Sequence, residues 1–186
     1  MSLRDAVLAA LLDGESSGYD LAKEFDASVA NFWMATPQQL YRELDRLAEQ
    51  GLISARIVHQ ERRPNKRMYS LTEAGYEAIR HFTSRAPRPS VIRDELAVQV
   101  LAADAGNAVA VRDFVAERLD WANAKLQRYE RFRARMLDGR TEEDYLHQAE
   151  RVGPYLTLLR GISFEQENIR WAERALAIIG QRLPQP

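Results

Sequence analysis

Apolar positions in the first third of the chain recur at helical spacing in short segments. Leu3–Leu12 is apolar on nearly every side, which predicts a first helix that is buried on most of its faces. A second helix is predicted over Tyr19–Ala27, with Leu21 on its inner face. Ser16 or Ser17 can cap this helix, because serine oxygens accept the unpaired N–H groups of a first turn.

A third helix is predicted from Pro37, and both of its ends carry strong signals. Thr36 is a good N-cap, and proline suits the first helical position because its missing N–H would be unpaired there. Gly51 ends the helix, since glycine accepts the left-handed conformation of a C-terminal cap. The buried face is marked by leucines at helical spacing, which are Leu40, Leu44 and Leu47.

The other faces of this third helix carry amide and guanidinium side chains, namely Gln38, Gln39, Arg42 and Arg46. The forked geometry of these groups matches the edges of DNA bases. Taken alone, such a face is more typical of a solvated helix, because Gln and Arg are common on protein surfaces. The segments that follow therefore decide between the two interpretations.

After Gly51 the hydrophobic period changes from that of a helix to that of strands. Leu52–His59 and Arg67–Leu71 predict two strands, joined by a charged turn over Gln60–Lys66. Thr72 then caps a fourth helix that runs to about residue 84. Three helices, two strands with a basic tip and a further helix, in that order, predict a winged helix-turn-helix over residues 1–85.

The proline-rich segment Ala86–Pro89 separates this part from a second domain, predicted over residues 90–182. Its first helix is expected over Ser90–Ala103, with Ser90 as the cap and with Leu96, Val100 and Leu101 facing inward. Two long antiparallel helices are expected over residues 108–137 and 142–179, the second bent or interrupted at residues 153–154. The predicted fold class is therefore mainly α, a winged helix followed by an all-α domain.

The apolar stripes of the two long helices are too extensive for one helical hairpin to bury. The simplest solution is a second copy of the chain across a two-fold axis, and the alternative is a monomeric hairpin that packs on the winged helix. The predicted dimer interface comprises Val111, Val115, Leu119, Leu126, Tyr155, Leu159, Ile162, Ile169 and Leu176.

Charge is focused in one segment of the chain. The 186 residues have a net charge of −1, and residues 1–88 hold 12 Lys+Arg and 12 Asp+Glu, a balance of zero. Within this half, Arg56–Arg67 contains five cations and one carboxylate, a local balance of +4. A focused basic segment favours a local contact with an anionic partner over binding through the whole surface.

Other classes of function find little support in the residues. The chain has no cysteine, which excludes disulfides and thiol chemistry. His59, His81 and His147 are far apart, and no phosphate-binding loop or nucleophile motif is present, so neither an enzyme nor a metal or other cofactor is expected. Without a basic leader or an apolar run of roughly 18 residues, the protein is expected in the cytoplasm with no membrane partner.

Aromatic residues near the junction of helices and on the long helices suggest a pocket for a small apolar or aromatic effector. The candidates are Phe32, Trp33, Trp121 and Trp171. The alternative is that these side chains are simply core and interface anchors. The sequence alone leaves both interpretations open.

Several of these segments together resemble the PadR family of bacterial transcriptional regulators. The similar segments are Ser17–Leu21, Phe32-Trp33, Thr36–Ile53, Arg63–Gly75 and Leu159–Glu173. The resemblance implies a homodimer that binds double-stranded operator DNA, and many members of the family release DNA when they bind a small molecule. Repression is the expected outcome for a small dimer of this kind.

The residues supply an expected mechanism for such binding. The third helix enters the major groove and the wing holds phosphates or the neighbouring minor groove. The predicted DNA-binding residues are Tyr19, Thr36, Gln38, Gln39, Tyr41, Arg42, Arg46, Arg62, Arg63, Asn65, Lys66 and Arg67. The alternative is a winged helix that docks a protein and does not bind DNA.

Overall fold

A computed structural model describes residues 3–28, 35–59, 65–87, 89 and 93–182. The chain divides into two compact units, Met1–Pro89 and Ser90–Pro186. Each unit contains its own clusters of buried apolar side chains. None of the helices in the described part of the chain combines the length and apolar character that crossing a bilayer requires.

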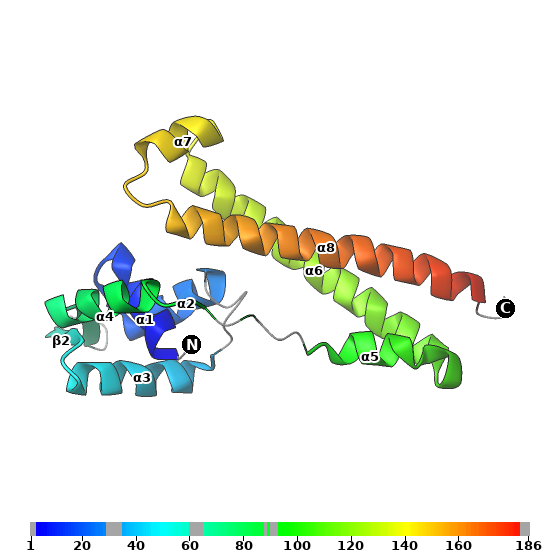
Figure 1. Cartoon of the computed structure of the whole chain (residues 1–186), viewed down its shortest axis with the longest axis horizontal. Helices are drawn as coiled ribbons and strands as arrows, with labels where there is room; N and C mark the ends of the chain where they lie inside the picture. Colours follow the sequence, from blue (N-terminus) through cyan, green and yellow to red (C-terminus); the bar gives the residue numbers. More distant parts are fainter. Residues whose placement is uncertain (1–2, 29–34, 60–64, 88, 90–92, 183–186) are drawn as a thin grey trace. The chain divides into compact units, whose positions relative to one another are not determined.

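The first unit contains four α-helices, labelled in Figure 1. In the described residues they are α1 (Leu3–Ala10), α2 (Gly18–Ser28), α3 (Pro37–Glu49) and α4 (Glu73–Thr83). A short 3₁₀ turn, η1 (Leu11–Asp13), follows α1 directly. The predicted caps are confirmed, since Ser17 Oγ accepts the Asp20 N–H and Thr36 Oγ1 accepts the Gln39 N–H. Gly51 adopts a φ of 68°, the left-handed conformation expected after α3.

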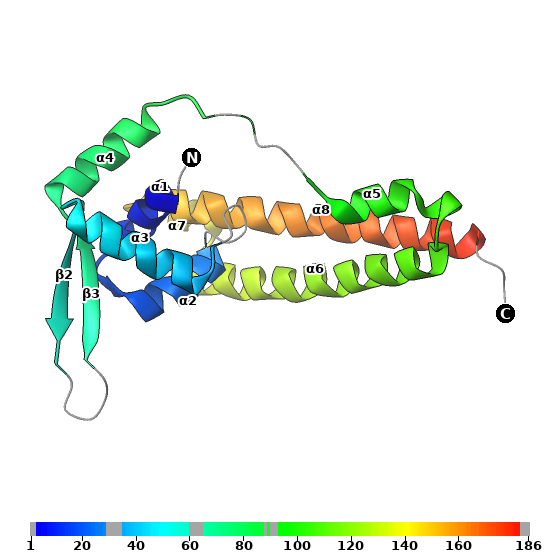
Figure 2. The same cartoon turned by 90° about the horizontal axis from the view of Figure 1, so that it is seen from below.

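The wing contains one strand more than the sequence predicted. Its three antiparallel strands lie in the order β1 (Ser16–Ser17), β3 (Lys66–Leu71), β2 (Ile53–Val58). Figure 2 shows β2 and β3 as the hairpin of the wing. The expectation of a two-stranded wing is therefore corrected, because the serines expected only as a turn and a cap also pair with Met68 and Tyr69.

The core of the first unit fixes the inner face of α3. Leu40, Leu44 and Leu47 are all buried, as predicted, in a cluster with α1, α2 and the strands. The helix α4 lies very close to the chain that enters β2, since a Cβ at Gly75 would come within 2.2 Å of the Leu52 carbonyl oxygen. The outer face of α3 is thereby held rigidly and left exposed.

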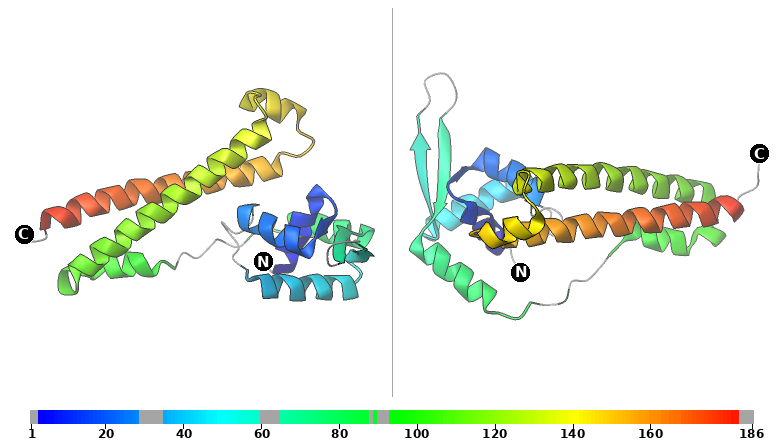
Figure 3. Two further views of the ribbon diagram at one scale, coloured as in Figure 1. Left: turned by 180° about the vertical axis from the view of Figure 1, so that it is seen from behind. Right: turned by 90° about the horizontal axis from the view of Figure 1, so that it is seen from above.

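The second unit is all-helical, as predicted. Its elements are α5 (Glu95–Leu101), the short 3₁₀ turn η2 (Ala103–Ala105), α6 (Ala108–Leu137), α7 (Glu142–Gln148) and α8 (Gly153–Arg182). The two long helices α6 and α8 lie against each other along the unit (Figures 1 and 3). The expected interruption near residues 153–154 is confirmed, because α7 ends at Gln148 and α8 begins at Gly153.

The first helix of this unit is shorter than the sequence predicted. It begins at Glu95, where Asp94 accepts the Leu96 N–H, whereas the predicted cap, Ser90, lies outside the described residues. Arg118 of α6 also binds Asp94, which fixes this position as the start of the helix. Leu101, expected to face inward, is 85% exposed because only the opposite side of this short helix contacts α6 and α8.

Candidate nucleic-acid interface

The exposed face of α3 presents polar and charged side chains over three turns. Gln38, Tyr41, Arg42 and Asp45 fall on this face because they are separated by three or four residues. All four are exposed. Within the described residues, neither Gln38 nor Arg42 makes a side-chain hydrogen bond or ion pair, so both are available to a ligand that lies along α3.

Tyr41 has a more constrained position than its neighbours on this face. Its ring packs against the start of α2, where a Cβ at Gly18 would lie 2.5 Å from Tyr41 Cε1. The remaining part of the ring is exposed. Tyr19, the second residue of α2, is 70% exposed, so both phenols can reach a ligand that follows α3.

Two of the predicted DNA-binding residues form the start of α3. Thr36 and Gln39 make a reciprocal capping box, in which Gln39 Oε1 accepts the Thr36 N–H at 2.9 Å and Thr36 Oγ1 accepts the Gln39 N–H at 3.2 Å. Their side-chain oxygens are therefore used within the helix. The Thr36 O–H and the amide nitrogen of Gln39 are left to donate to a ligand.

The cations of β3 pair with carboxylates on other elements. Lys66 Nζ lies 3.3 Å from Asp20 Oδ2 of α2, and Arg67 Nη1 donates to Asp45 Oδ1 of α3 at 2.6 Å. The Arg67 guanidinium also lies 5.2 Å from the centre of the Tyr69 ring. These contacts fix both side chains beside α3.

Two further cations of the first unit have carboxylate partners. Of the three residues predicted at the wing tip, the structure describes only Asn65. Arg46 lies 3.6 Å from Glu43, one turn earlier on α3, and Arg56 of β2 donates through Nε to Glu15 at 2.6 Å. Asn65 is exposed at the start of β3. Arg62 and Arg63 lie outside the described residues.

The carboxylates beside the wing are held in their charged form. Hydrogen bonds from Ser17 and then Lys66 keep the pKa of Asp20 below its ordinary value. A hydrogen bond from Arg56 does the same to the pKa of Glu15. Both carboxylates are therefore charged at neutral pH, as the ion pairs require. The partners are distant along the chain, so these pairs could not be predicted from the sequence.

Of the four aromatic residues predicted to form an effector pocket, the structure describes two. Phe32 and Trp33 lie outside the described residues. Trp171 is half-buried in the cluster formed by α5, α6 and α8. Trp121 is 74% exposed and lines a hollow of about 460 Å³ between α5 and α6.

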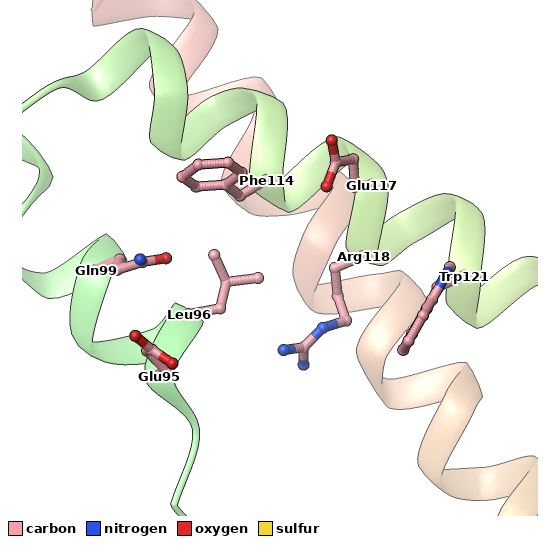
Figure 4. Close-up of a pocket in the computed structure, with 7 residues that line it drawn as sticks. All are labelled: Glu95, Leu96, Gln99, Phe114, Glu117, Arg118 and Trp121. Atoms are coloured by element: carbon pink, nitrogen blue, oxygen red, sulfur yellow. The ribbon is translucent and has the colours of Figure 1, made fainter.

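Figure 4 shows the side chains around this hollow. Leu96 extends from α5 toward α6, with Phe114 and Arg118 on either side, and Trp121 lies further along α6. The other lining residues are Glu95, Gln99 and Glu117. The hollow thus offers aromatic faces beside negatively charged carboxylates and a positively charged guanidinium.

Within the described residues, no group of three or more His, Asp or Glu side chains could hold a metal ion.

The residues predicted for a dimer interface are used within the chain. All nine are buried or half-buried, mostly between α6 and α8, and they are Val111, Val115, Leu119, Leu126, Tyr155, Leu159, Ile162, Ile169 and Leu176. On the outer face of α8, three further large apolar side chains, Leu156, Phe164 and Ile178, are exposed. Their spacings of eight and fourteen residues place them on one side, opposite the buried stripe.

Two families of known sequences match the two units. Residues 7–81 match the "Transcriptional regulator PadR-like family", and residues 92–180 match "Virulence activator alpha C-term". The chain is 29% identical over 182 residues to the negative transcriptional regulator PadR of Bacillus subtilis, covering 95% of this chain and 97% of that protein.

Solved structures agree over nearly the whole chain. The B. subtilis PadR structure in complex with operator DNA has a TM-score of 0.74 at 28% identity and covers 95% of this chain and 98% of that one. The structure of the same regulator in complex with p-coumaric acid has a TM-score of 0.69 at 27% identity and covers 96% of this chain and 95% of that one. The structure of the Vibrio cholerae virulence activator AphA has a TM-score of 0.70 at 29% identity and covers 98% of this chain and 100% of that one.

Proposed function

Because the chain belongs to the PadR-like family of transcriptional regulators, we propose that α3 reads an operator in the major groove. Proteins of this family are DNA-binding regulators and not enzymes. The observation that carries this proposal is the exposed face of α3, where the side chains of Gln38 and Arg42 are available within the described residues. Both have the forked geometry that matches purine edges. The match of the chain to a relative solved on operator DNA supports the same placement.

Other side chains of this unit position the protein on the DNA backbone. Tyr41 and Tyr19 present hydroxyl groups beside the reading face and donate to phosphates. Lys66 and Arg67 contact the phosphates next to the groove, and Arg62 and Arg63 add charge at the tip of the wing. Contacts of this second kind fix the register of the protein and carry no sequence information.

The regulator acts as a homodimer through the second unit. The outer face of α8 supports this assignment, because three large apolar side chains, Leu156, Phe164 and Ile178, are exposed there. Leu101 of α5 is a further apolar side chain exposed in this unit. Burial of these side chains would favour a dimer, and a two-fold dimer presents two reading helices to a palindromic operator. Repression is the proposed outcome, as for the B. subtilis relative named a negative regulator.

Selection of bound fragments from randomised duplex DNA tests this proposal. The expected product is a pseudo-palindrome with half-sites one helical turn, or a multiple of it, apart. Sedimentation of the free protein at micromolar concentration is expected to give a dimer, and Phe164→Glu is expected to shift it toward monomer. If no sequence is enriched, the assignment of α3 as a reading helix is wrong.

A small aromatic molecule releases the regulator from DNA in this proposal. The hollow between α5 and α6 supports it, since Trp121 and Phe114 expose aromatic faces there. The B. subtilis relative has been solved with p-coumaric acid. A panel of phenolic acids is expected to change the tryptophan fluorescence of the wild type and not of Trp121→Phe. An unchanged wild-type signal across the panel would count against this effector site.

The alternative is a winged helix that docks a protein partner without DNA. The salt dependence of binding to random duplex distinguishes the two, because phosphate contacts release counterions. Binding that weakens steeply as salt rises is expected here. A complete lack of binding at low salt would favour the docking alternative.

A further inference from the structure

The cations that β3 carries toward the proposed DNA site already have partners within the protein. Lys66 pairs with Asp20 of α2, and Arg67 pairs with Asp45 of α3. The two carboxylates come from different helices, and both side chains remain about half exposed, 43% for Asp20 and 55% for Asp45. Each pair is therefore open to solvent and within reach of a competing anion.

We propose that Asp20 and Asp45 compete with DNA phosphates for Lys66 and Arg67, and thereby set the affinity of the winged helix for DNA. The proposal rests on the proposed function, since it requires that α3 and the wing face a duplex. In the free protein each cation is neutralised by its carboxylate. On DNA the cation exchanges that partner for a phosphate, and the carboxylate is left facing the same polyanion.

The geometry makes this exchange feasible in both pairs. Ion pairs that are exposed to solvent contribute little to folding, so a phosphate can replace the carboxylate without unfolding the wing. Arg67 uses only Nη1 for Asp45, and its ring contact with Tyr69 holds the guanidinium in place when the carboxylate is displaced. The remaining N–H groups of a guanidinium can then donate to a phosphate oxygen.

Asp45 is the stronger of the two competitors because of its place on α3. It follows Arg42 by three residues on the same exposed face, so it enters or borders the groove whenever Arg42 reaches a base. A carboxylate at this position lies close to phosphates and is repelled by them. Asp20 also accepts the Ser17 hydroxyl at 2.6 Å, which holds it at the start of α2.

The test compares carboxylate-to-amide variants by titration of fluorescent duplexes over a range of salt concentrations. The variants are Asp45→Asn and Asp20→Asn, each in the full chain, on the selected operator and on random duplex. Glu77→Gln is the matched control, because Glu77 forms an exposed pair with Arg80 on α4, outside the proposed DNA and dimer contacts, and its substitution changes net charge equally. Thermal unfolding of each variant checks that the fold is retained.

The expected result is tighter binding to both duplexes. The variants make the same phosphate contacts as the wild type but break no ion pair to do so, and an ion pair this exposed corresponds to a gain in affinity of up to about fivefold. Asp45→Asn is expected to approach this gain, Asp20→Asn to show a smaller one, and Glu77→Gln to match the wild type.

Two outcomes would overturn the competition. In the first, the amide variants match Glu77→Gln in affinity for both duplexes, so that the ion pairs do not oppose DNA. In the second, Asp45→Asn weakens operator binding, so that Asp45 contacts a base or holds Arg67 in position. Both differ from failure of the proposed function, in which the wild type itself binds neither duplex at low salt.

Discussion

The two units of this regulator use ion pairs in opposite ways. In the winged-helix unit, Lys66 and Asp20 form a pair that is about half exposed on both sides. In the helical unit, Lys125 of α6 lies 3.0 Å from Glu165 of α8, whose side chain is only 4% exposed. Asn168 donates to the second oxygen of the same carboxylate at 3.0 Å. A lysine–carboxylate pair is thus open to exchange with another anion in the first unit and part of the packed interior in the second.

The difference follows from what each unit has to do. A surface that binds a polyanion must release its cations, and solvent exposure makes that inexpensive in free energy. A buried carboxylate without its partner is costly, so the Lys125–Glu165 pair specifies how α6 and α8 align. Substitutions in the two units should therefore affect different properties, DNA affinity in the first and stability in the second.

Breaking the buried pair is expected to have the largest effect. Lys125→Met leaves the buried Glu165 carboxylate with the Asn168 hydrogen bond but without its cation, which should lower the free energy of unfolding by about 3 kcal/mol. Urea unfolding followed by circular dichroism measures this loss. Lys66→Met is the matched control, and it should cost no more than about 1 kcal/mol because its pair is exposed. Equal losses in the two variants would contradict the comparison.

Packing, and not charge, should dominate stability in the winged-helix unit. Gly75→Ala places a Cβ 2.2 Å from the Leu52 carbonyl oxygen, so α4 must move away from the sheet. The expected cost is about 1–3 kcal/mol in thermal or urea unfolding. Gly180→Ala on α8 meets nothing within 4 Å and should instead stabilise its helix by up to about 1 kcal/mol. A neutral Gly75→Ala would show that α4 does not pack this closely.

A smaller effect is expected at the buried phenol of the helical unit. Arg133 Nε donates to the Tyr155 hydroxyl at 3.0 Å, and Arg133 also pairs with Glu142 at 2.6 Å. Tyr155→Phe removes the hydrogen bond but keeps the ring, and should lower stability by about 1 kcal/mol. A double-mutant cycle with Arg133→Met measures the coupling, and its absence would contradict this contact.

The same cluster should make the helical unit sensitive to acid to a small extent. Hydrogen bonds from Arg133 and then Tyr155 hold the pKa of Glu142 below its ordinary value of 4.5. Its contribution to stability is therefore present above pH 4.5 and is lost as the pH falls through the lowered pKa. Unfolding curves between pH 6 and 3 should show this decline in the wild type and less of it in Glu142→Gln. Identical pH profiles would contradict it.

Local signals in the sequence predicted much of the helical framework. The ends of α3 follow from Thr36, Pro37 and Gly51, which act on their nearest neighbours along the chain, and α6 spans the predicted residues 108–137. Such signals need no knowledge of tertiary structure. The predicted residue types on α3 likewise lie exposed on its outer face.

What the sequence could not predict depends on contacts between distant residues. The strand β1 consists of two serines with no strand pattern of their own, and it exists because β3 pairs with it. Asp94 caps α5 through the Leu96 N–H and also binds Arg118, 24 residues later, and the second contact has no signal in the sequence. The partners of Lys66 and Arg67 are 46 and 22 residues away, so the paired state of these cations was also invisible in the sequence.

The central claim is that the exposed face of α3 reads DNA, and Arg42→Ala tests it most directly. Titration of wild type and variant on the selected operator and on random duplex gives both affinities in one experiment. The account predicts that the variant loses about 1–3 kcal/mol per half-site on the operator and clearly less on random duplex. Unchanged operator affinity, or equal losses on both duplexes, would contradict a role for Arg42 in reading bases.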